Sequence, residues 1–333
     1  MAYIVVIAFI KEVSSTHKYN PFMKQTLSIS IFLVILLSLA ACSSQGGVDR
    51  RMYEGDVRFL CDESFFNVLD QHVFVFTRSN PGAYITAAPV TEVDAVKALL
   101  DDSVRLIAIS RELTKAEKEA IIQNRLESRS THVAVDAVAF VVNKQNPDSV
   151  LSVDDIRRIM TGEVTQWTQL FPSSKLDNIQ VIFDNRHSGT VRYVVDSICA
   201  PQKLYPGVSA VENSLQVIRE VSRRPNAIGV LGAAWIDAND SADVPVRELV
   251  SPVAVKKTAE AQPFGPFQAY IASGEYPFFR SIYMIKTETH NGLCTGFTIF
   301  VAGQRGQKIF EKTNISPARI EERVVNVSSD FNE

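Results

Sequence analysis

The sequence predicts an α/β fold of two lobes, each with a mainly parallel sheet flanked by helices, and three observations support this prediction. Short apolar runs such as residues 104–109 (VRLIAI) have the composition of strands buried on both faces. Amphipathic segments that begin at capping residues alternate with these runs, which is the order typical of α/β architecture. The chain has 333 residues, a length that fits two domains of ordinary size better than one.

The first strand and helix of lobe 1 are predicted from residue 56 onward. Residues 56–60 (DVRFL) alternate between polar and apolar side chains, as a half-buried strand does. The stretch that begins at Ser64 places Phe66, Leu69 and Val73 on one face of a helix. This part of the chain therefore predicts a strand that leads directly into a helix.

Two more strand–helix pairs follow in lobe 1. Residues 83–90 are predicted to form a strand, after which Thr91 caps a helix with an acidic residue three positions later. Residues 104–109 are the next strand, and the capping box Thr114–Glu117 begins a helix that runs toward Leu126.

Lobe 2 is predicted to span residues 133–251. It opens with a long apolar run, residues 133–142, and Ser152 caps the helix that follows. A strand at residues 179–183 leads to an amphipathic helix, and residues 227–232 (AIGVLG) form a glycine-bounded strand.

The C-terminal part of the chain is predicted to return to lobe 1. It carries an aromatic, proline-rich stretch over residues 262–284 and a terminal helix over residues 295–312. We therefore expect lobe 1 to combine residues 56–132 with 252–333, so that two crossing segments join it to lobe 2 (133–251).

The N-terminal segment, residues 1–42, has the pattern of an export signal. A short apolar run follows a lysine, and it ends at Leu39–Cys42 (LAAC), which resembles the lipobox of bacterial lipoproteins. In that case Cys42 would carry the lipid, Met23 would be the true start, and residues 43–55 would form a flexible tether. The alternative is a plain transmembrane anchor, for which the run is short.

Charge and cysteine content exclude several classes of function. The net charge is -3 and no Lys/Arg block is present, which argues against a nucleic-acid partner. Besides Cys42, the chain has Cys61, Cys199 and Cys294, without a C-x-x-C motif or histidines at metal spacing. These cysteines are interpreted as small buried apolar residues. No dinucleotide fingerprint follows the first strand, so we expect no cofactor and no metal.

Hydroxyl side chains stand at three predicted turns from strand to helix. These are Ser64, Thr91, and the pair Ser188 and Thr190 around Gly189. Unpaired N–H groups and the helix dipole make such turns suitable for an anion. Simple helix capping is the alternative for each hydroxyl, although a glycine between two hydroxyls allows the backbone to approach a ligand closely.

From about Val57 to Pro317, the chain resembles the phosphate-binding protein family of bacterial ABC transporters. That family has the two-lobed periplasmic binding protein type II fold. The likeness rests on the order and spacing of several stretches, namely Ala108–Arg111, Val135–Asn143 with Asn146–Pro147, Leu151–Trp167, Ser188–Thr190, Ala227–Val230, Glu275–Arg280 and Gly306–Gln307.

The resemblance implies a phosphate site, and part of it matches this sequence. In the family, phosphate contacts a Ser-Gly-Thr turn and hydroxyls at the first two helix starts. Ser188, Gly189 and Thr190 match the turn. Ser64 matches the first hydroxyl, whereas the second falls on Thr91 or on its neighbour Glu92, depending on the alignment.

Two charged positions depart from the family. The family's arginine four residues before the serine of the turn is Asp184 here, and its aspartate is Arg111. We interpret this as an exchange in which Arg111 supplies the cation and Asp184 orients it. Arg186 is a second candidate cation, and Glu92 is a candidate acceptor for the proton of a monoprotonated phosphate. The alternatives are a structural ion pair for Arg111 and an exposed first-turn acid for Glu92.

The resemblance implies a binding protein that is not an enzyme. We expect a monomeric lipoprotein in the bacterial cell envelope, anchored by a lipid (palmitate) at Cys42. It would capture a small oxyanion, phosphate before others, and deliver it to the permease of an ABC transporter. One alternative is a sensing module of the same fold. The other is a serine hydrolase that uses Asp184, His187 and Ser188, although no G-x-S-x-G elbow is present.

Overall fold

The structure is a computed structural model that describes residues 50–239 and 242–319. These residues belong to one compact unit, Asp49–Glu333. The predicted signal region with Met23 and Cys42 lies outside the described residues. Among the residues described, no helix combines the length and apolar character needed to cross a membrane.

Alternating strands and helices form the first part of the described chain, as the sequence predicts. In chain order they are η1 (Arg50–Met52), β1 (Gly55–Asp62), η2 (Glu63–Phe65), α3 (Phe66–Ser79), β2 (Ala83–Val90), α4 (Glu92–Leu100), β3 (Leu106–Ile109), α5 (Lys115–Gln123) and β4 (Arg129–Asn143).

The middle of the chain continues the alternation with shorter elements. They are β5 (Val150–Ser152), α6 (Val153–Thr161), η3 (Trp167–Gln169), β6 (Gln180–Phe183), α7 (Gly189–Tyr193), the π-helical η4 (Val194–Cys199), β7 (Ser209–Ala210), α8 (Ser214–Arg223), β8 (Ala227–Gly232) and η5 (Ala233–Trp235).

The last part contains α9 (Val246–Leu249), β9 (Val250–Pro252), β10 (Ala254–Lys256), α10 (Gln268–Ala272), β11 (Phe279–Lys286), α11 (Leu293–Ala302), α12 (Gln304–Phe310) and β12 (Ser316–Pro317). The terminal helix expected over residues 295–312 is therefore two helices. They meet at Gly303, and the backbone folds tightly there, because a Cβ on Gly306 would lie 2.4 Å from the carbonyl oxygens of Phe300 and Val301.

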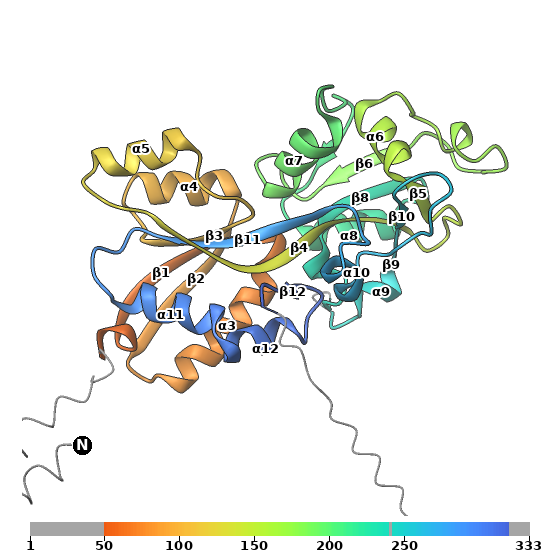
Figure 1. Ribbon diagram of the computed structural model, residues 1–333. Helices are drawn as coiled ribbons and strands as arrows, with labels where there is room; N and C mark the ends of the chain where they lie inside the picture. The colour runs from red at the N-terminus through yellow and green to blue at the C-terminus, as the bar shows by residue number, and fades with distance from the viewer. Residues whose placement is uncertain (1–49, 240–241, 320–333) are drawn as a thin grey trace, which may run out of the picture. The chain divides into compact units, whose positions relative to one another are not determined.

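Most strands belong to one mixed sheet in the order β2-β1-β3-β11-β4-β8-β6-β7, with β9 and β12 beside β4. Neighbouring strands are parallel within β2-β1-β3 and within β8-β6-β7, whereas β11 and β4 pair antiparallel. Figure 1 shows β4 and β11 running side by side from the half with β1–β3 into the half with β6 and β8. The predicted two-lobed α/β fold is confirmed, except that the parallel strands of the two halves are joined by antiparallel β11 and β4 into one mixed sheet.

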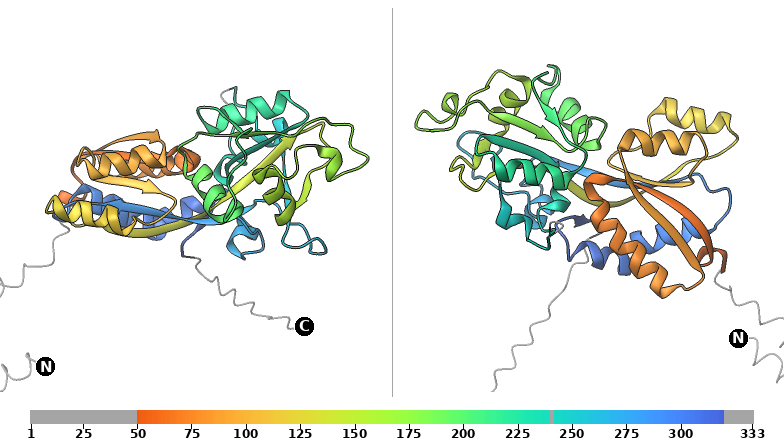
Figure 2. Two further views of the ribbon diagram at one scale, coloured as in Figure 1. Left: turned by 90° about the horizontal axis from the view of Figure 1, so that it is seen from above. Right: turned by 180° about the vertical axis from the view of Figure 1, so that it is seen from behind.

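Helices cover both faces of the strands in the first half. α3 and α11 share one core with β1 and β3, and α4 and α5 share another with β1 and β3 on the opposite face. Figure 2 shows, from behind, α3 beside the C-terminal helices on one side and α4 with α5 on the other. The second half has its own core, which includes Phe140, Trp167 and Phe183.

The division of residues between these cores shows that the chain passes from one lobe to the other within β4 and near the start of β11. Val133 and Ala134 pack in the core of lobe 1, whereas residues 137–142 pack in that of lobe 2. The sequence predicts that the chain returns to lobe 1 at about residue 252. The structure corrects this position, because Val253, Val255 and Phe278 still pack in the core of lobe 2. On this packing we assign residues 50–134 and 279–319 to lobe 1 and residues 137–278 to lobe 2, within the described chain.

Local capping explains where several helices begin. Thr114 with Glu117 and Ser152 with Asp155 form reciprocal capping boxes, and Thr91 accepts the N–H of Asp94. These three helix starts confirm the sequence prediction. The cysteines at 61, 199 and 294 are free and buried, in agreement with their interpretation as small apolar residues.

Candidate functional site

The end of β1 places two buried polar side chains at the boundary between the lobes. Asp62 and Ser64 are both fully buried. The Ser64 N–H and hydroxyl donate to Oδ1 of Asp62 at 2.9 and 2.7 Å. This turn directly follows a strand, which fixes the direction in which both side chains point.

A buried ion pair lies beside this turn, where β4 and β11 pass between the lobes. Asp136 and Arg280 are paired residues of β4 and β11. Nη2 and Nε of Arg280 donate to Oδ2 of Asp136 at 2.7 and 3.0 Å, and Nη2 also donates to the Ser64 hydroxyl at 2.8 Å. Burial disfavours the charge of Arg280, but Asp136 and Asp62 outweigh that effect and raise its pKa.

Lobe 2 contributes the Ser-Gly-Thr turn between β6 and α7. The Ser188 hydroxyl donates to Oδ1 of Asp184 at 2.7 Å and accepts the Val191 N–H at 3.2 Å. The Gly189 N–H crosses to lobe 1 and donates to Oδ2 of Asp62 at 3.0 Å. Thr190 is fully buried, and its hydroxyl lies 3.5 Å from Nη1 of Arg280.

Gly189 leaves no room for a side chain at this contact. A Cβ there would lie 2.5 Å from Oδ2 of Asp62, 2.5 Å from the Ser110 hydroxyl and 2.8 Å from Oε2 of Glu92. All three neighbours belong to lobe 1. The glycine is therefore needed so that the backbone of lobe 2 can approach the polar groups of lobe 1.

Glu92 forms the next contact between the lobes. It is buried at the start of α4 and accepts the Ser110 hydroxyl at 2.8 Å. Arg192 of α7 donates to Oε1 of Glu92 at 2.5 Å, and Arg111 donates to the same oxygen at 3.1 Å. Burial opposes the charge of Glu92, but these donors hold its pKa below the usual value.

A third contact between the lobes joins Glu63 to the start of α8. The Glu63 carboxylate accepts the Ser214 N–H at 3.2 Å and its hydroxyl at 2.9 Å. Burial, with the nearby charge of Asp184, raises the pKa of Glu63 to about 8. We call the boundary residues Asp62, Glu63, Glu92, Asp136 and Asp184 the seam carboxylates.

Three other seam carboxylates, Asp184, Asp62 and Asp136, also have pKa values that burial raises. Burial raises the pKa of Asp184 to about 6, although the Ser188 hydroxyl partly offsets that effect. Burial also raises the pKa of Asp62, which Arg280 counteracts. Shifts of this kind in a cluster of buried groups are typical of a functional site.

The structure brings together most of the residues proposed from the sequence. Those at the seam are Ser64, Glu92, Asp184, Ser188, Gly189 and Thr190. Thr91 instead caps α4 and pairs with Asp94. Glu92, rather than Thr91, is the residue whose side chain contacts the other lobe.

The proposed bond between Arg111 and Asp184 is wrong. Arg111 donates to both oxygens of Glu117 at 2.8 Å, because the capping box at the start of α5 places that carboxylate beside it. Asp184 accepts bonds from Ser188 and from the Asn185 N–H instead. Arg111 therefore lies at the rim of the seam and is oriented by carboxylates of its own lobe.

Sequence reasoning missed two arginines that contact buried polar groups of the seam, Arg280 and Arg192. The sequence does contain an indication of Arg280, because Asp136 is a lone carboxylate in the apolar run VAVDAVAFVV and needs a partner. A charge in a buried strand needs a partner, and Arg280 is the one that β11 supplies. Arg192 gave no such signal, since a basic residue on an amphipathic helix is usually solvated.

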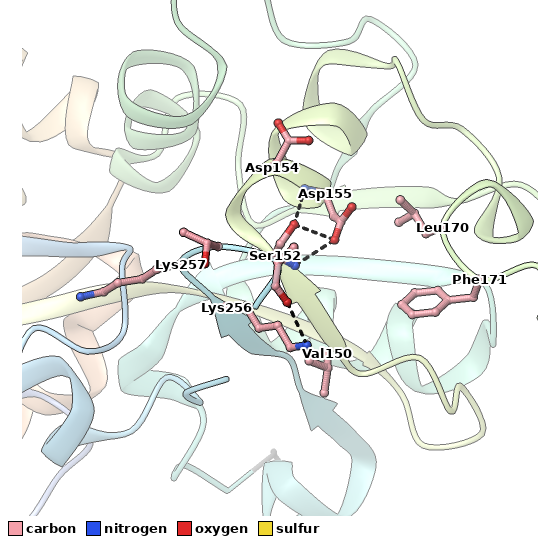
Figure 3. A pocket seen from close by; sticks show the side chains of 10 residues that line it. Val150, Ser152, Asp154, Asp155, Leu170, Phe171, Lys256 and Lys257 are labelled. Carbon is pink, nitrogen blue, oxygen red and sulfur yellow. Dashed lines mark hydrogen bonds between the residues drawn. The ribbon is translucent and has the colours of Figure 1, made fainter. Parts of the chain in front are cut away.

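Two pockets lie elsewhere on lobe 2. One has a volume of about 350 Å³ beside β5 and β10. Figure 3 shows Leu170 and Phe171 on its far side from Lys257, with Ser152 bonded to Asp155 between them. The other pocket, of about 260 Å³, includes Arg186 and apolar neighbours. Arg186 thus lines the second pocket, and no hydrogen bond or ion pair among the described residues joins it to a seam carboxylate.

Comparisons with known proteins agree with this architecture. Residues 47–305 match a family model described as PBP superfamily domain. The chain is 22% identical to the phosphate-binding protein PstS of Pseudomonas aeruginosa over 91% of this chain and 98% of the relative. Its identity to the phosphate-binding protein PstS of Borreliella burgdorferi is 21%, covering 74% and 84%.

Solved structures show the same fold. A substrate-binding protein of Clostridium perfringens with bound phosphate superposes with a TM-score of 0.66 at 21% identity, covering 80% of this chain and 100% of the other. An ABC-type phosphate transport receptor from Vibrio cholerae has a TM-score of 0.58 at 19% identity, covering 78% and 98%.

Proposed function

The chain belongs to the PBP superfamily, and on that basis we propose that it is an extracytoplasmic solute-binding protein that captures a small oxyanion, phosphate before others. One observation carries the proposal. The Gly189 N–H of lobe 2 meets the Asp62–Ser64 turn of lobe 1, with Arg280 in contact with Ser64. The relatives named as phosphate-binding proteins support the same ligand class.

The residues around this point have the donors that a tetrahedral oxyanion needs. Ser64, Ser188 and Thr190 have hydroxyls, Gly189 has an N–H group, and Arg280 has a guanidinium fork. All of them are buried. Buried donors replace the water that the anion loses on entry, and a charge-assisted bond to arginine strengthens the exchange.

Capture would proceed by hinge closure about the two strands that join the lobes. Asp136 of β4 and Arg280 of β11 are paired where these two strands pass between the lobes, so the hinge is adjacent to the proposed site. The contacts Glu63–Ser214 and Glu92–Arg192 would form as the lobes close. Closure therefore buries the anion and joins the lobes in one movement.

Delivery to the permease of an ABC transporter completes the proposal. A lipid on Cys42 would keep the protein, as a monomer, at a membrane surface of the cell envelope, and residues 43–55 would act as the tether. Confinement to that surface raises the effective concentration of the binding protein near the permease. A ligand sensor with the same binding site would differ only in its partner.

Calorimetry on the mature protein with phosphate, sulfate, molybdate and carboxylates tests the ligand class. We expect phosphate to bind and Gly189→Ala to abolish binding, since the new methyl group would collide with Asp62 and Ser110. Arg186→Ala, three residues earlier, is the matched control and should bind as the wild type does. Absence of heat with every oxyanion would refute the proposal.

A further inference from the structure

The N–H group that the Ser-Gly-Thr turn offers to an anion is already bonded to a carboxylate of the protein. Gly189 donates to Oδ2 of Asp62, while Oδ1 of the same side chain is held by Ser64. The Cβ position on Gly189 would lie within 2.8 Å of oxygens from Asp62, Ser110 and Glu92. An oxyanion that takes this N–H must therefore displace Asp62.

The charges around this point do not favour an added anion. The charged groups of this region come from several elements: Glu63 from η2, Glu92 from α4, Arg111 after β3, Asp136 from β4, Asp184 after β6, Arg192 from α7 and Arg280 from β11. The charges of the five seam carboxylates are thus opposed by those of three arginines. One of these arginines, Arg111, also pairs with Glu117.

Protonation is the cheapest way to balance a further negative charge here. Oδ2 of Asp184 is buried and has no hydrogen-bond partner among the described residues. Burial and neighbouring carboxylates already raise the pKa values of Glu63 and Asp184 to about 8 and about 6. An anion beside them raises these pKa values further, so the complex holds more protons than the free protein.

We propose that Asp62 is an internal competitor for the captured oxyanion, so that binding exchanges its carboxylate for the oxyanion at Gly189 and takes up protons at the seam carboxylates. This inference rests on the proposed function and specifies its regulation. Asp62 acts here as a positioning residue, because its carboxylate joins the two lobes through the Gly189 N–H. The affinity for phosphate accordingly falls as the pH rises.

Calorimetry of phosphate binding tests the exchange, in buffers of different ionisation enthalpy between about pH 5.5 and 8.5. Asp62→Asn keeps the shape of the side chain and removes its charge. We expect it to bind phosphate about tenfold more tightly at the upper pH and to take up fewer protons, because the competing bond is to a charged group. Asp56→Asn is the matched control, since Asp56 lies on the same strand and is exposed.

Comparing the variant with the wild type at one pH cancels the protons that phosphate itself exchanges. Phosphate binding by the wild type, together with tighter binding and smaller proton uptake by Asp62→Asn, supports the competitor. Equal or weaker binding by Asp62→Asn with unchanged proton uptake overturns this inference and leaves the proposed function intact. If neither protein binds phosphate at any pH, both proposals fall. If Asp62→Asn does not fold, the proton uptake of the wild type tests the exchange instead. Uptake beyond the protons that phosphate itself exchanges supports it, and the absence of such uptake overturns it.

Discussion

Two groups of arginine and carboxylate lie at the boundary between the lobes, and they differ in burial. The inner pair, Arg280 with Asp136, has side chains that are 2% and 0% exposed. In the outer group, Arg111 is 23% exposed and binds Glu92 and Glu117. Water can reach Arg111 and Glu117 of the outer group, and buried Glu92 keeps Arg192 as a second partner, whereas the inner pair has neither. The centre of the seam is therefore fixed, whereas its rim tolerates change.

The largest effect is expected from Arg280→Met, which removes one partner of the inner pair. Asp136 would remain as a buried charge without compensation, so the free energy of unfolding should fall by about 3–5 kcal/mol. Phosphate binding should also be lost, because the guanidinium that contacts Ser64 is gone. Urea denaturation and calorimetry measure the two effects.

The double variant Arg280→Met with Asp136→Leu separates stability from binding. Replacing a buried ion pair by apolar residues of similar size is often neutral, so most of the stability should return. Phosphate binding should not return with it. A loss below about 1 kcal/mol in the single variant would contradict the contrast between the inner pair and the outer group.

Glu63 is a third case beside the inner pair and the outer group, because this buried carboxylate has no arginine within ion-pair distance among the described residues. Its pKa in the folded protein is about 8, above the value near 4.5 of an exposed glutamate. The folded state thus holds the proton more tightly, so its stabilising contribution is complete below about pH 4.5 and is lost as the pH rises through 8. Glu63→Gln should remove that loss and be about 1–2 kcal/mol more stable than the wild type near pH 9.

Urea denaturation across this pH range measures the effect. Glu212→Gln is the matched control, since Glu212 lies just before α8 and is exposed. Its stability should follow the wild type at each pH. Parallel pH profiles for Glu63→Gln and the wild type would mean that Glu63 does not titrate in this range.

The contrast also explains what the sequence could predict. Strands, caps and the Ser188–Thr190 turn follow from local periodicity and turn chemistry, and these predictions agree with the structure. The pairing of Arg280 with Asp136 depends on the register between two strands far apart in the sequence. The partner of Arg111 is local, but its position in a motif predicts only that it is charged and does not predict that it binds Glu117 of the following helix.

A smaller effect is expected from Arg111→Ala in the outer group. Glu92 keeps its bonds to Arg192 and Ser110 in this variant, so no carboxylate is left unpaired. Phosphate affinity should fall by less than about tenfold, which corresponds to about 1.4 kcal/mol. Calorimetry checks this value. A loss of a hundredfold or more would place Arg111 on the anion itself and remove the distinction between centre and rim.

The smallest effect is expected from Thr91→Ala, beside Glu92 at the start of α4. Thr91 caps the helix by accepting the Asp94 N–H, so its loss should cost about 1 kcal/mol of stability. Phosphate affinity should stay unchanged, because the Thr91 hydroxyl is bonded to Asp94 and Glu92 is the residue that faces the seam. Thr91→Ser, which keeps the cap, should restore the stability measured by urea denaturation. If Thr91→Ala lost affinity for phosphate and Thr91→Ser restored it, the Thr91 hydroxyl would instead be the one that corresponds to the family's second hydroxyl.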